Sequence, residues 1–155
     1  MRRKDREIVS YVKMIKIMQQ CDCCRISLMD GAAPYIVPLN FGYDEKDGEL
    51  YLYFHSATEG KKLELIRKHP DVGFEMDTKH ALVTGETACA YSFLYQSIIG
   101  KGKMELLEEN AEKIEGLNAI MRNYTNRDSW EYDSKVLDKI VVMRLCVTEW
   151  TCKEH

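Results

Sequence analysis

The chain has 155 residues, of which 25 are acidic and 22 are basic, and its net charge is −3 at neutral pH. This length favours a single domain over residues 1–155, and the interspersed charges exclude the broad basic surface that binds nucleic acid or an anionic membrane. No apolar run approaches the roughly 20 residues needed to cross a bilayer, and the basic start precedes an amphipathic segment rather than the apolar core of a signal peptide. We therefore expect a cytoplasmic protein.

The first predicted elements are a helix and a β-hairpin. Apolar residues recur at helical spacing from Asp5 to Gln20, with no glycine or proline between them. Two strand-like runs follow, Cys23 to Met29 and Tyr35 to Tyr43, and Asp30-Gly31 joins them. This dipeptide tolerates the positive φ of a tight turn, so we expect the two strands to pair antiparallel.

The later elements are, in order, a strand at 49–55, a helix at about 58–68, a strand at 71–76, one or two strands within 89–107, a helix at 110–123 and a strand at 139–151. The strand at 49–55 should complete a three-stranded meander with the hairpin. Gly100 and Gly102 permit a bend or bulge where a ligand can approach. Short strands with tight turns favour an antiparallel barrel with peripheral helices over a doubly wound sheet.

The cysteines suggest reduced thiols, because their even number comes without an export signal. The one cluster, C-D-C-C at 21–24, lacks the C-x-x-C spacing of a zinc site. A strand would send Cys21 and Cys23 to one face and Cys24 to the other. We therefore predict no metal site and interpret the cysteines as small core residues.

The segment from Tyr51 to Lys62 is the strongest candidate for a phosphate site. A strand-like run ends in small polar residues and then opens a helix that carries Lys61 and Lys62. A helix start offers unpaired N–H groups and a positive dipole end, and the lysines add charge. A Walker loop is excluded, because it needs a glycine where His55 stands and a hydroxyl where Lys62 stands. The alternative is that both lysines belong to the solvated first turn of a surface helix.

Five segments together form a more specific pattern: MRRKDREI, PYIVPLNFGY, LYFHSATEGKKLELI, HPDVGFEMD and SIIGKG. In their order and separation they resemble the nitroimidazole-resistance (Nim) proteins, within the pyridoxamine 5′-phosphate oxidase-like flavin-binding split barrels. The resemblance covers nearly the whole chain. It implies a mainly β (α+β) fold, a six-stranded antiparallel split β-barrel with peripheral helices, and a homodimer with two FMN molecules at the subunit interface.

The resemblance also implies the cofactor-binding residues. The flavin ring would lie along a strand whose backbone meets its pyrimidine edge, here Ile36, Val37, Pro38, Leu39 and Asn40. The phosphate would be held by a polar pair and by two basic residues further on, here His55 with Ser56 and Lys61 with Lys62. A second flavin-adjacent strand would contribute Ser97, Gly100 and Lys101. Pro38 indicates an edge strand, since proline cannot donate to a ladder.

His55 is the candidate catalytic residue. A histidine after an apolar strand is often a hydrogen-bonded structural residue, and that interpretation stays open. In Nim-like proteins a histidine in this neighbourhood is associated with the active site. With an ordinary pKa near 6.5, it could serve as a proton donor or a substrate contact.

These features predict an FMN-dependent oxidoreductase that reduces a small electron-poor substrate such as a nitroaromatic, in the manner of a 5-nitroimidazole reductase. NAD(P)H, if it is the donor, would bind transiently, because no G-x-G-x-x-G fingerprint is present. Pyridoxamine phosphate oxidation is disfavoured, since the arginines expected near the chain end are absent from 149–155. The alternative from another class is a flavin- or small-molecule-binding module without turnover.

Overall fold

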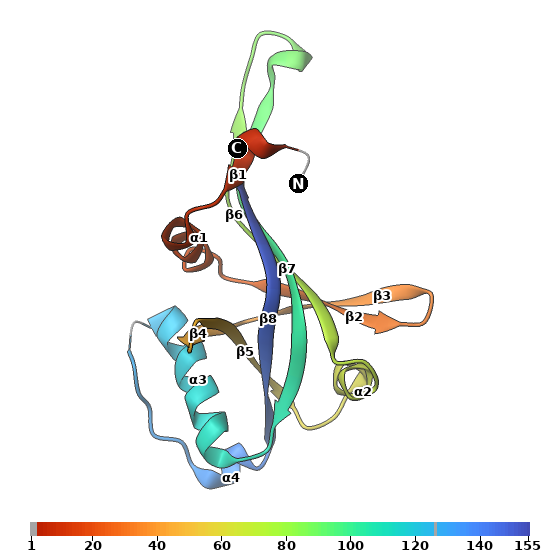
Figure 1. The fold of residues 1–155 in the computed structure, drawn as a ribbon, viewed down its shortest axis with the longest axis vertical. Coiled ribbons are helices and arrows are strands. Elements are labelled where there is room, and N and C mark those ends of the chain that lie inside the picture. The colour runs from red at the N-terminus through yellow and green to blue at the C-terminus, as the bar shows by residue number, and fades with distance from the viewer. Residues whose placement is uncertain (1–2, 126) are drawn as a thin grey trace.

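The computed structural model describes residues 3–125 and 127–155, which form one antiparallel sheet with helices around it (Figure 1). The strands are β1 (Glu7–Ile8), β2 (Cys24–Asp30), β3 (Ala33–Leu39), β4 (Gly42–Lys46), β5 (Glu49–Ala57), β6 (Asp71–Val83), β7 (Ser92–Leu107) and β8 (Ile140–Glu154). The helices are α1 (Tyr11–Met18), α2 (Lys61–Lys68), α3 (Asn110–Thr125) and α4 (Ser134–Leu137), with short 3₁₀ turns at Lys4–Arg6 and Ala88–Ala90. The strand order is β3-β2-β6-β7-β8-β5-β4, and β1 pairs with β8.

Two hydrophobic cores lie on the two sides of β5, because successive side chains of a strand point to opposite faces. Leu52 and Phe54 are fully buried in the larger core, which also contains the apolar residues of α1 and α2. Tyr53 faces the other way and packs with Leu117 and Ile120 of α3 in the smaller core. Each such buried side chain contributes roughly 1.5–3 kcal/mol to folding, so β5 ties both cores together.

The structure confirms the β2–β3 hairpin and the edge position of Pro38. Gly31 has φ of 62°, the left-handed conformation that the turn requires. β3 is the last strand of the order and pairs only with β2, so its second edge has unpaired backbone groups. A proline is tolerated in such a strand because no ladder hydrogen bond is lost.

The predicted three-stranded meander is wrong, because the strand expected at 35–43 is two strands. β3 ends at Leu39 and pairs with β2, whereas β4 begins at Gly42 and pairs with β5. Between them Phe41 turns into the core, and its N–H donates to the hydroxyl of Tyr124 over 3.1 Å. Its carbonyl accepts from Asn123 over 3.3 Å. Contacts to α3 therefore break the strand at this point.

The split barrel class is as expected, but the number of strands and two element boundaries differ. The sheet has eight strands rather than six. The N-terminal helix begins only at Tyr11, since Glu7 and Ile8 pair with β8 instead. β6 runs past its predicted end at residue 76 as far as Val83, where it pairs with Ser92 at the start of β7, a single strand inside the predicted range 89–107. The register shift between Lys101 and Gly102 confirms the expected bulge.

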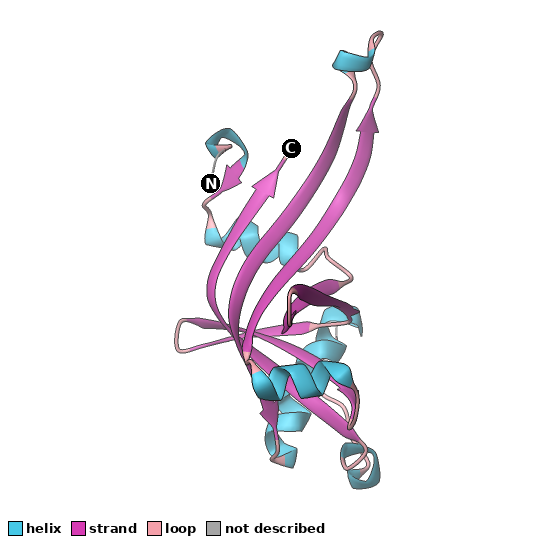
Figure 2. Ribbon diagram, turned by 90° about the vertical axis from the view of Figure 1, so that its right-hand side faces the viewer, coloured by secondary structure: helices cyan, strands magenta, loops and turns pink. Residues whose placement is uncertain are grey.

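The extension of β6 and β7 forms a hairpin that projects beyond the other strands (Figure 2). A register shift between Thr78 and Ala81 separates it from the body of the sheet, and Lys79 there has φ of 55°. We call residues 81–94 the arm. The sequence patterns did not predict it.

All six cysteines are free thiols. The expected alternation of C-D-C-C is wrong, because Cys21 and Cys24 are both buried in the larger core and the strand begins only at Cys24. Burial raises the pKa of the Cys21 thiol to about 12 and that of Cys24 further. Both therefore stay neutral and pack as small apolar residues.

Among the described helices, none has the length and apolar character to span a bilayer.

Candidate functional site

The corner between β5 and α2 presents an open helix start. Gly60 is the N-cap residue with φ of 129°, a conformation that glycine adopts without strain. Its carbonyl accepts hydrogen bonds from the N–H groups of Leu63 and Glu64, and no side chain caps the helix. The N–H groups of Lys61 and Lys62 precede the first helical hydrogen bond. They are available to an anion, which the positive end of the helix dipole also favours.

The two lysines of this first turn differ in their surroundings. The ammonium of Lys61 lies 2.5 Å from Oδ2 of Asp30 and 4.9 Å from the centre of the Tyr35 ring. Its side chain is 51% exposed, so it is a surface pair that holds α2 against the β2–β3 turn. Lys62 is half-buried, and burial alone lowers the pKa of its ammonium. No carboxylate among the residues that the structure describes pairs with Lys62, and an incoming anion would stabilise such a half-buried ammonium.

His55 lies near Lys62 at the end of β5, where it pairs with Val142 of β8. The residue is exposed at the sheet surface, yet enough protein surrounds the imidazole to lower the pKa below its ordinary 6.5. The positive charge of Lys62 lowers this pKa further. His55 is therefore neutral at pH 7, with one ring nitrogen as donor and the other as acceptor.

Phosphate binding at this corner should raise the pKa of His55. We expect a value below 6.5 in the free protein, because burial and Lys62 disfavour the imidazolium. A bound phosphate neutralises Lys62 and favours the imidazolium, so FMN should shift the pKa upward. An NMR titration of the His55 ring protons measures both values. Riboflavin, which lacks the phosphate, should leave the pKa unchanged; an equal shift with both flavins would contradict this position of the phosphate.

Ser56 is the weakest member of the predicted phosphate group. Its hydroxyl donates to the carbonyl oxygen of Ala57 over 2.7 Å, at the end of its own strand. The oxygen can still accept, and the hydroxyl can rotate toward a ligand. The structure thus places Ser56 at the corner but with its donor already used.

β3 presents an exposed face and a free edge beside this corner. Ile36, Pro38 and Asn40 point to solvent, and Ile36 is 60% exposed. Val37 and Leu39 are half-buried against the larger core. The ion pair between Lys61 and the β2–β3 turn brings β3 close to the start of α2. The corner and the edge strand therefore form one continuous region.

A hollow of about 360 Å³ lies on the outer face of the sheet, which is the face turned away from the larger core. Its lining residues come from four neighbouring strands: Arg25, Ser27, Ile36, Gly73, Phe74, Glu75, Ile99 and Gly100. Arg25 closes one side through ion pairs to Glu75 over 3.0 Å and Asp77 over 2.6 Å. Sequence reasoning missed this hollow, although the exposed Ile36 and Ile99 in strand patterns were a signal for it.

The three residues predicted on the second flavin-adjacent strand, Ser97, Gly100 and Lys101, all lie on β7, but only Gly100 lines the hollow. Gly100 lines the hollow with Ile36, but a Cβ there would lie 2.4 Å from the Phe74 ring, so packing alone explains the glycine. Ser97 lies further along the outer face, and Lys101 pairs with Glu149 over 2.8 Å. β2 and β6 separate all three from β3 within one chain. They do not join the β5–α2 corner.

In residues 3–125 and 127–155, no three histidine, cysteine, aspartate or glutamate side chains gather as a metal site.

Comparisons with known proteins found matches that extend over nearly the whole chain. The sequence profile of the pyridoxamine 5′-phosphate oxidase family matches residues 13–154. A candidate 5-nitroimidazole antibiotic resistance protein from Bacteroides thetaiotaomicron is 32% identical in sequence, with a TM-score of 0.82, over 96% of this chain and 86% of that chain. A search of curated proteins found no match.

Two more distant structures share the fold. The flavocytochrome Anf3 from Azotobacter vinelandii has a TM-score of 0.79 at 18% identity, over 100% of this chain and 72% of that chain. The FAD and heme binding protein from Mycobacterium smegmatis has a TM-score of 0.80 at 18% identity, over 96% and 73% of the two chains.

Proposed function

This chain belongs to the pyridoxamine 5′-phosphate oxidase-like family of flavin-binding proteins, and from that premise we propose that it is an FMN-dependent oxidoreductase acting on a small, flat, electron-poor substrate such as a nitroaromatic. The observation that carries the proposal is Lys62 at the uncapped start of α2, a half-buried ammonium that no carboxylate of residues 3–125 and 127–155 pairs with. One such lysine beside one helix start suits a single phosphate monoester. This favours FMN over a dinucleotide flavin.

The residues of the corner and the edge strand fit this cofactor. Lys62 and the first N–H groups of α2 would hold the phosphate, and Lys61 would add charge while it stays paired with Asp30. The free edge of β3, from Ile36 to Asn40, offers backbone donors and acceptors to the pyrimidine edge of the ring. When bound, the flavin supplies the electrons for substrate reduction.

His55 would supply protons to the reduced substrate. It would donate from its imidazolium form, which is the minor form at pH 7 because its pKa is lowered, and would then regain a proton from water. Lys101 is the candidate for balancing negative charge at the reduced ring, although Glu149 already partners it. Water is the alternative proton source.

We also propose a homodimer with the flavin at the subunit interface. On the outer face, the large apolar side chains of Ile36 and Ile99 are 60% and 56% exposed. Ser97, Gly100 and Lys101 lie on that face, away from the corner of their own chain. In a dimer these three would contact the flavin bound to the second copy.

The proposed reaction is tested by mixing the purified flavin-loaded protein with NAD(P)H and then with a nitroimidazole, without oxygen. We expect the yellow flavin absorbance to bleach with the nicotinamide and to return when the nitroimidazole is added. If neither NAD(P)H nor the nitroimidazole changes the flavin absorbance, the result would instead support a binding module without turnover.

Replacement of His55 by alanine should slow turnover more than it weakens cofactor binding. A positioned general acid typically contributes 10²–10⁴-fold to rate, so we expect kcat to fall about 100-fold. The FMN dissociation constant should change less than about threefold, because Lys62 and the α2 backbone remain. Stopped-flow reoxidation and flavin fluorescence measure the two quantities. His69→Ala, an exposed histidine at the other end of α2, is the matched control; equal effects of both variants would make His55 structural.

A further inference from the structure

The arm has the composition of an interface rather than of a solvated hairpin. Residues 81–94 include one charged side chain, Glu86, whereas 30% of the whole chain is charged. Charge depletion with aromatic enrichment is typical of an interface core. Its exposed large apolar residues are Leu82, Val83, Tyr91, Phe93 and Leu94. A two-stranded ribbon is marginally stable alone in water, so this surface requires a cover.

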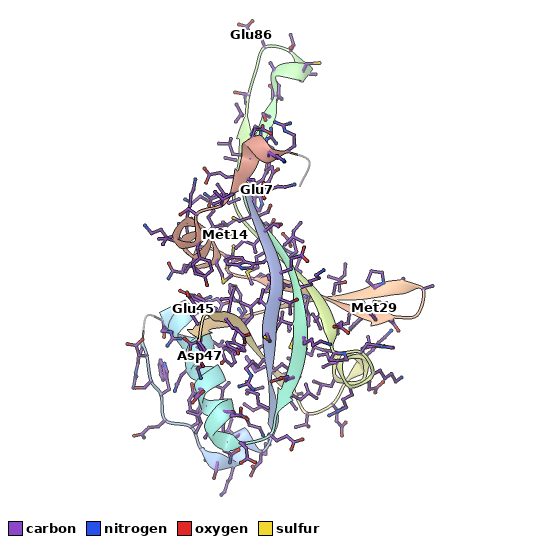
Figure 3. All side chains as sticks on the ribbon, viewed as in Figure 1. Glu7, Met14, Met29, Glu45, Asp47 and Glu86 are labelled. Atoms are coloured by element: carbon purple, nitrogen blue, oxygen red, sulfur yellow. The ribbon has the colours of Figure 1, made fainter. Side chains whose placement is uncertain are left out.

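The arm contacts its own chain near its base, where the hydroxyl of Ser92 lies 2.6 Å from Nε2 of His155, yet its large apolar side chains remain exposed. Glu86 marks its tip, well beyond the helices and beyond Met29 on the β2–β3 hairpin (Figure 3). Figure 2 shows the same separation from the side, with the arm extending past the ends of all other strands. The cover must therefore come from another molecule.

The outer face of the chain carries both a projecting aromatic residue and a hollow. Leu82 pairs with Phe93 in the arm, and they are 61% and 48% exposed. The ring of His80 stacks against Phe93 with centroids 5.9 Å apart, which orients the phenyl ring. Side-chain alternation along β7 puts Phe93 on the same face as Ile99, which borders the hollow. One strand thus presents a projection and a recess on one surface.

We propose that the arm of each copy packs across the outer face of a second copy and seats Phe93 in the partner's hollow beside Ile99 and Ile36. The proposal rests on the homodimer of the proposed function. A two-fold axis that lies between the two outer faces, level with Gln96, reverses the strand and pairs each Phe93 with the partner's Ile99. A second copy would fill both hollows and cover both arms at once. An unrelated partner would cover only the arm or only the hollow.

The consequence is that each flavin site is completed by an aromatic residue of the other copy. Ile36 lines the hollow and also belongs to the edge strand proposed for the flavin ring. Phe93 of the partner subunit would therefore lie next to that strand. It would exclude water from the region where the ring is expected.

A disulfide between introduced cysteines tests this contact. Phe93 and Ile99 are six residues apart on one strand, which is roughly 20 Å and beyond the reach of a disulfide within the chain. In a Cys89→Ser background, the folded double variant Phe93→Cys/Ile99→Cys should form a covalent dimer on mild oxidation, seen on a non-reducing gel. Each single variant should remain uncrosslinked. The control pair Phe93→Cys/Lys103→Cys, displaced by roughly 13 Å along β7, should do the same.

Light scattering on the same samples separates this contact from the homodimer itself. A dimer that forms no disulfide in the double variant would overturn the arm contact and leave the homodimer standing. Crosslinking of Phe93→Cys alone would also overturn it, since the two arms would then face each other. A monomer that still binds FMN would overturn both the contact and the homodimer, while the phosphate site would survive.

A second variant measures the energetics of the contact. Phe93→Ala should raise the dimer dissociation constant about 100-fold, because a two-fold interface loses the buried ring twice. Val136→Ala, an exposed residue on α4, is the control and should leave the constant unchanged. Analytical ultracentrifugation gives both values, and circular dichroism checks that the variants are folded. Equal dissociation constants for parent and Phe93→Ala would contradict the proposal.

Discussion

Replacing Lys62 with alanine is expected to weaken FMN binding about 100-fold, the largest effect on cofactor affinity of any single change at this corner. A charge-assisted hydrogen bond to phosphate is worth about 2–3 kcal/mol, and within the described part of the chain no carboxylate pairs with Lys62. The effect of Lys61→Ala should be smaller, about threefold, because Lys61 is an exposed surface lysine that Asp30 already partners. A flavin fluorescence titration gives both dissociation constants.

Two controls identify the phosphate as the cause. Riboflavin should bind the parent and Lys62→Ala equally, since it has no phosphate to lose. Lys68→Ala, at the opposite end of α2, should leave FMN binding unchanged. The flavin-free variant should unfold at the same or a higher denaturant concentration than the parent, because a half-buried unpaired ammonium is removed. An FMN affinity unaltered by Lys62→Ala would place the phosphate elsewhere.

Local sequence signals were sufficient where one residue decides the backbone. Asp30-Gly31 fixed a tight turn, Pro38 indicated an edge strand, and Gly102 marked a bulge, and the structure has all three features. Each depends on the φ that a residue can adopt or on a missing N–H. The start of α2 was predicted at about residue 58, whereas the helix begins at Lys61, directly after Gly60 with its positive φ.

Sequence patterns failed where distant residues decide the outcome. The break between β3 and β4 depends on Tyr124 and Asn123, which bind the backbone of Phe41 from the end of α3. The pattern at 35–43 is strand-like throughout, so nothing local marks the break. The same limit applies to the N-terminus, where Ile8 was counted with a helix but pairs with Cys152 of β8.

In the candidate site too, the sequence predicted local features but not the contacts between distant residues. Sequence reasoning named Lys61 and Lys62 together and had no means to rank them. The structure distinguishes them through Asp30, which lies at the turn of another hairpin and engages only Lys61. The hollow was missed because Ile36, Gly73 and Ile99 come from three strands that only the sheet order brings together. The local sequence can propose a ligand, but the fold decides which side chains remain free to bind it.

A large loss of stability should come from Gly42→Ala. A Cβ at this position would lie 2.2 Å from the backbone of Ala119 and Ile120, so α3 rests directly on the first residue of β4. Backbone atoms on a packed helix cannot move aside as a flexible side chain can. We expect the free energy of unfolding to fall by about 3 kcal/mol, the upper end of the usual cost of overpacking.

Urea denaturation measures this loss, and Gly73→Ala is the matched control. The nearest atom to a Cβ on Gly73 is Cβ of Ser27 at 3.7 Å, an ordinary contact, so its free energy of unfolding should change by less than about 1 kcal/mol. The effect of Gly42→Ala should reach the site as well. If α3 is displaced, Tyr124 and Asn123 can no longer hold Phe41, and the end of β3 loses its anchor. FMN affinity should then fall together with stability; a destabilised variant that binds FMN normally would show that the β3 edge does not depend on α3.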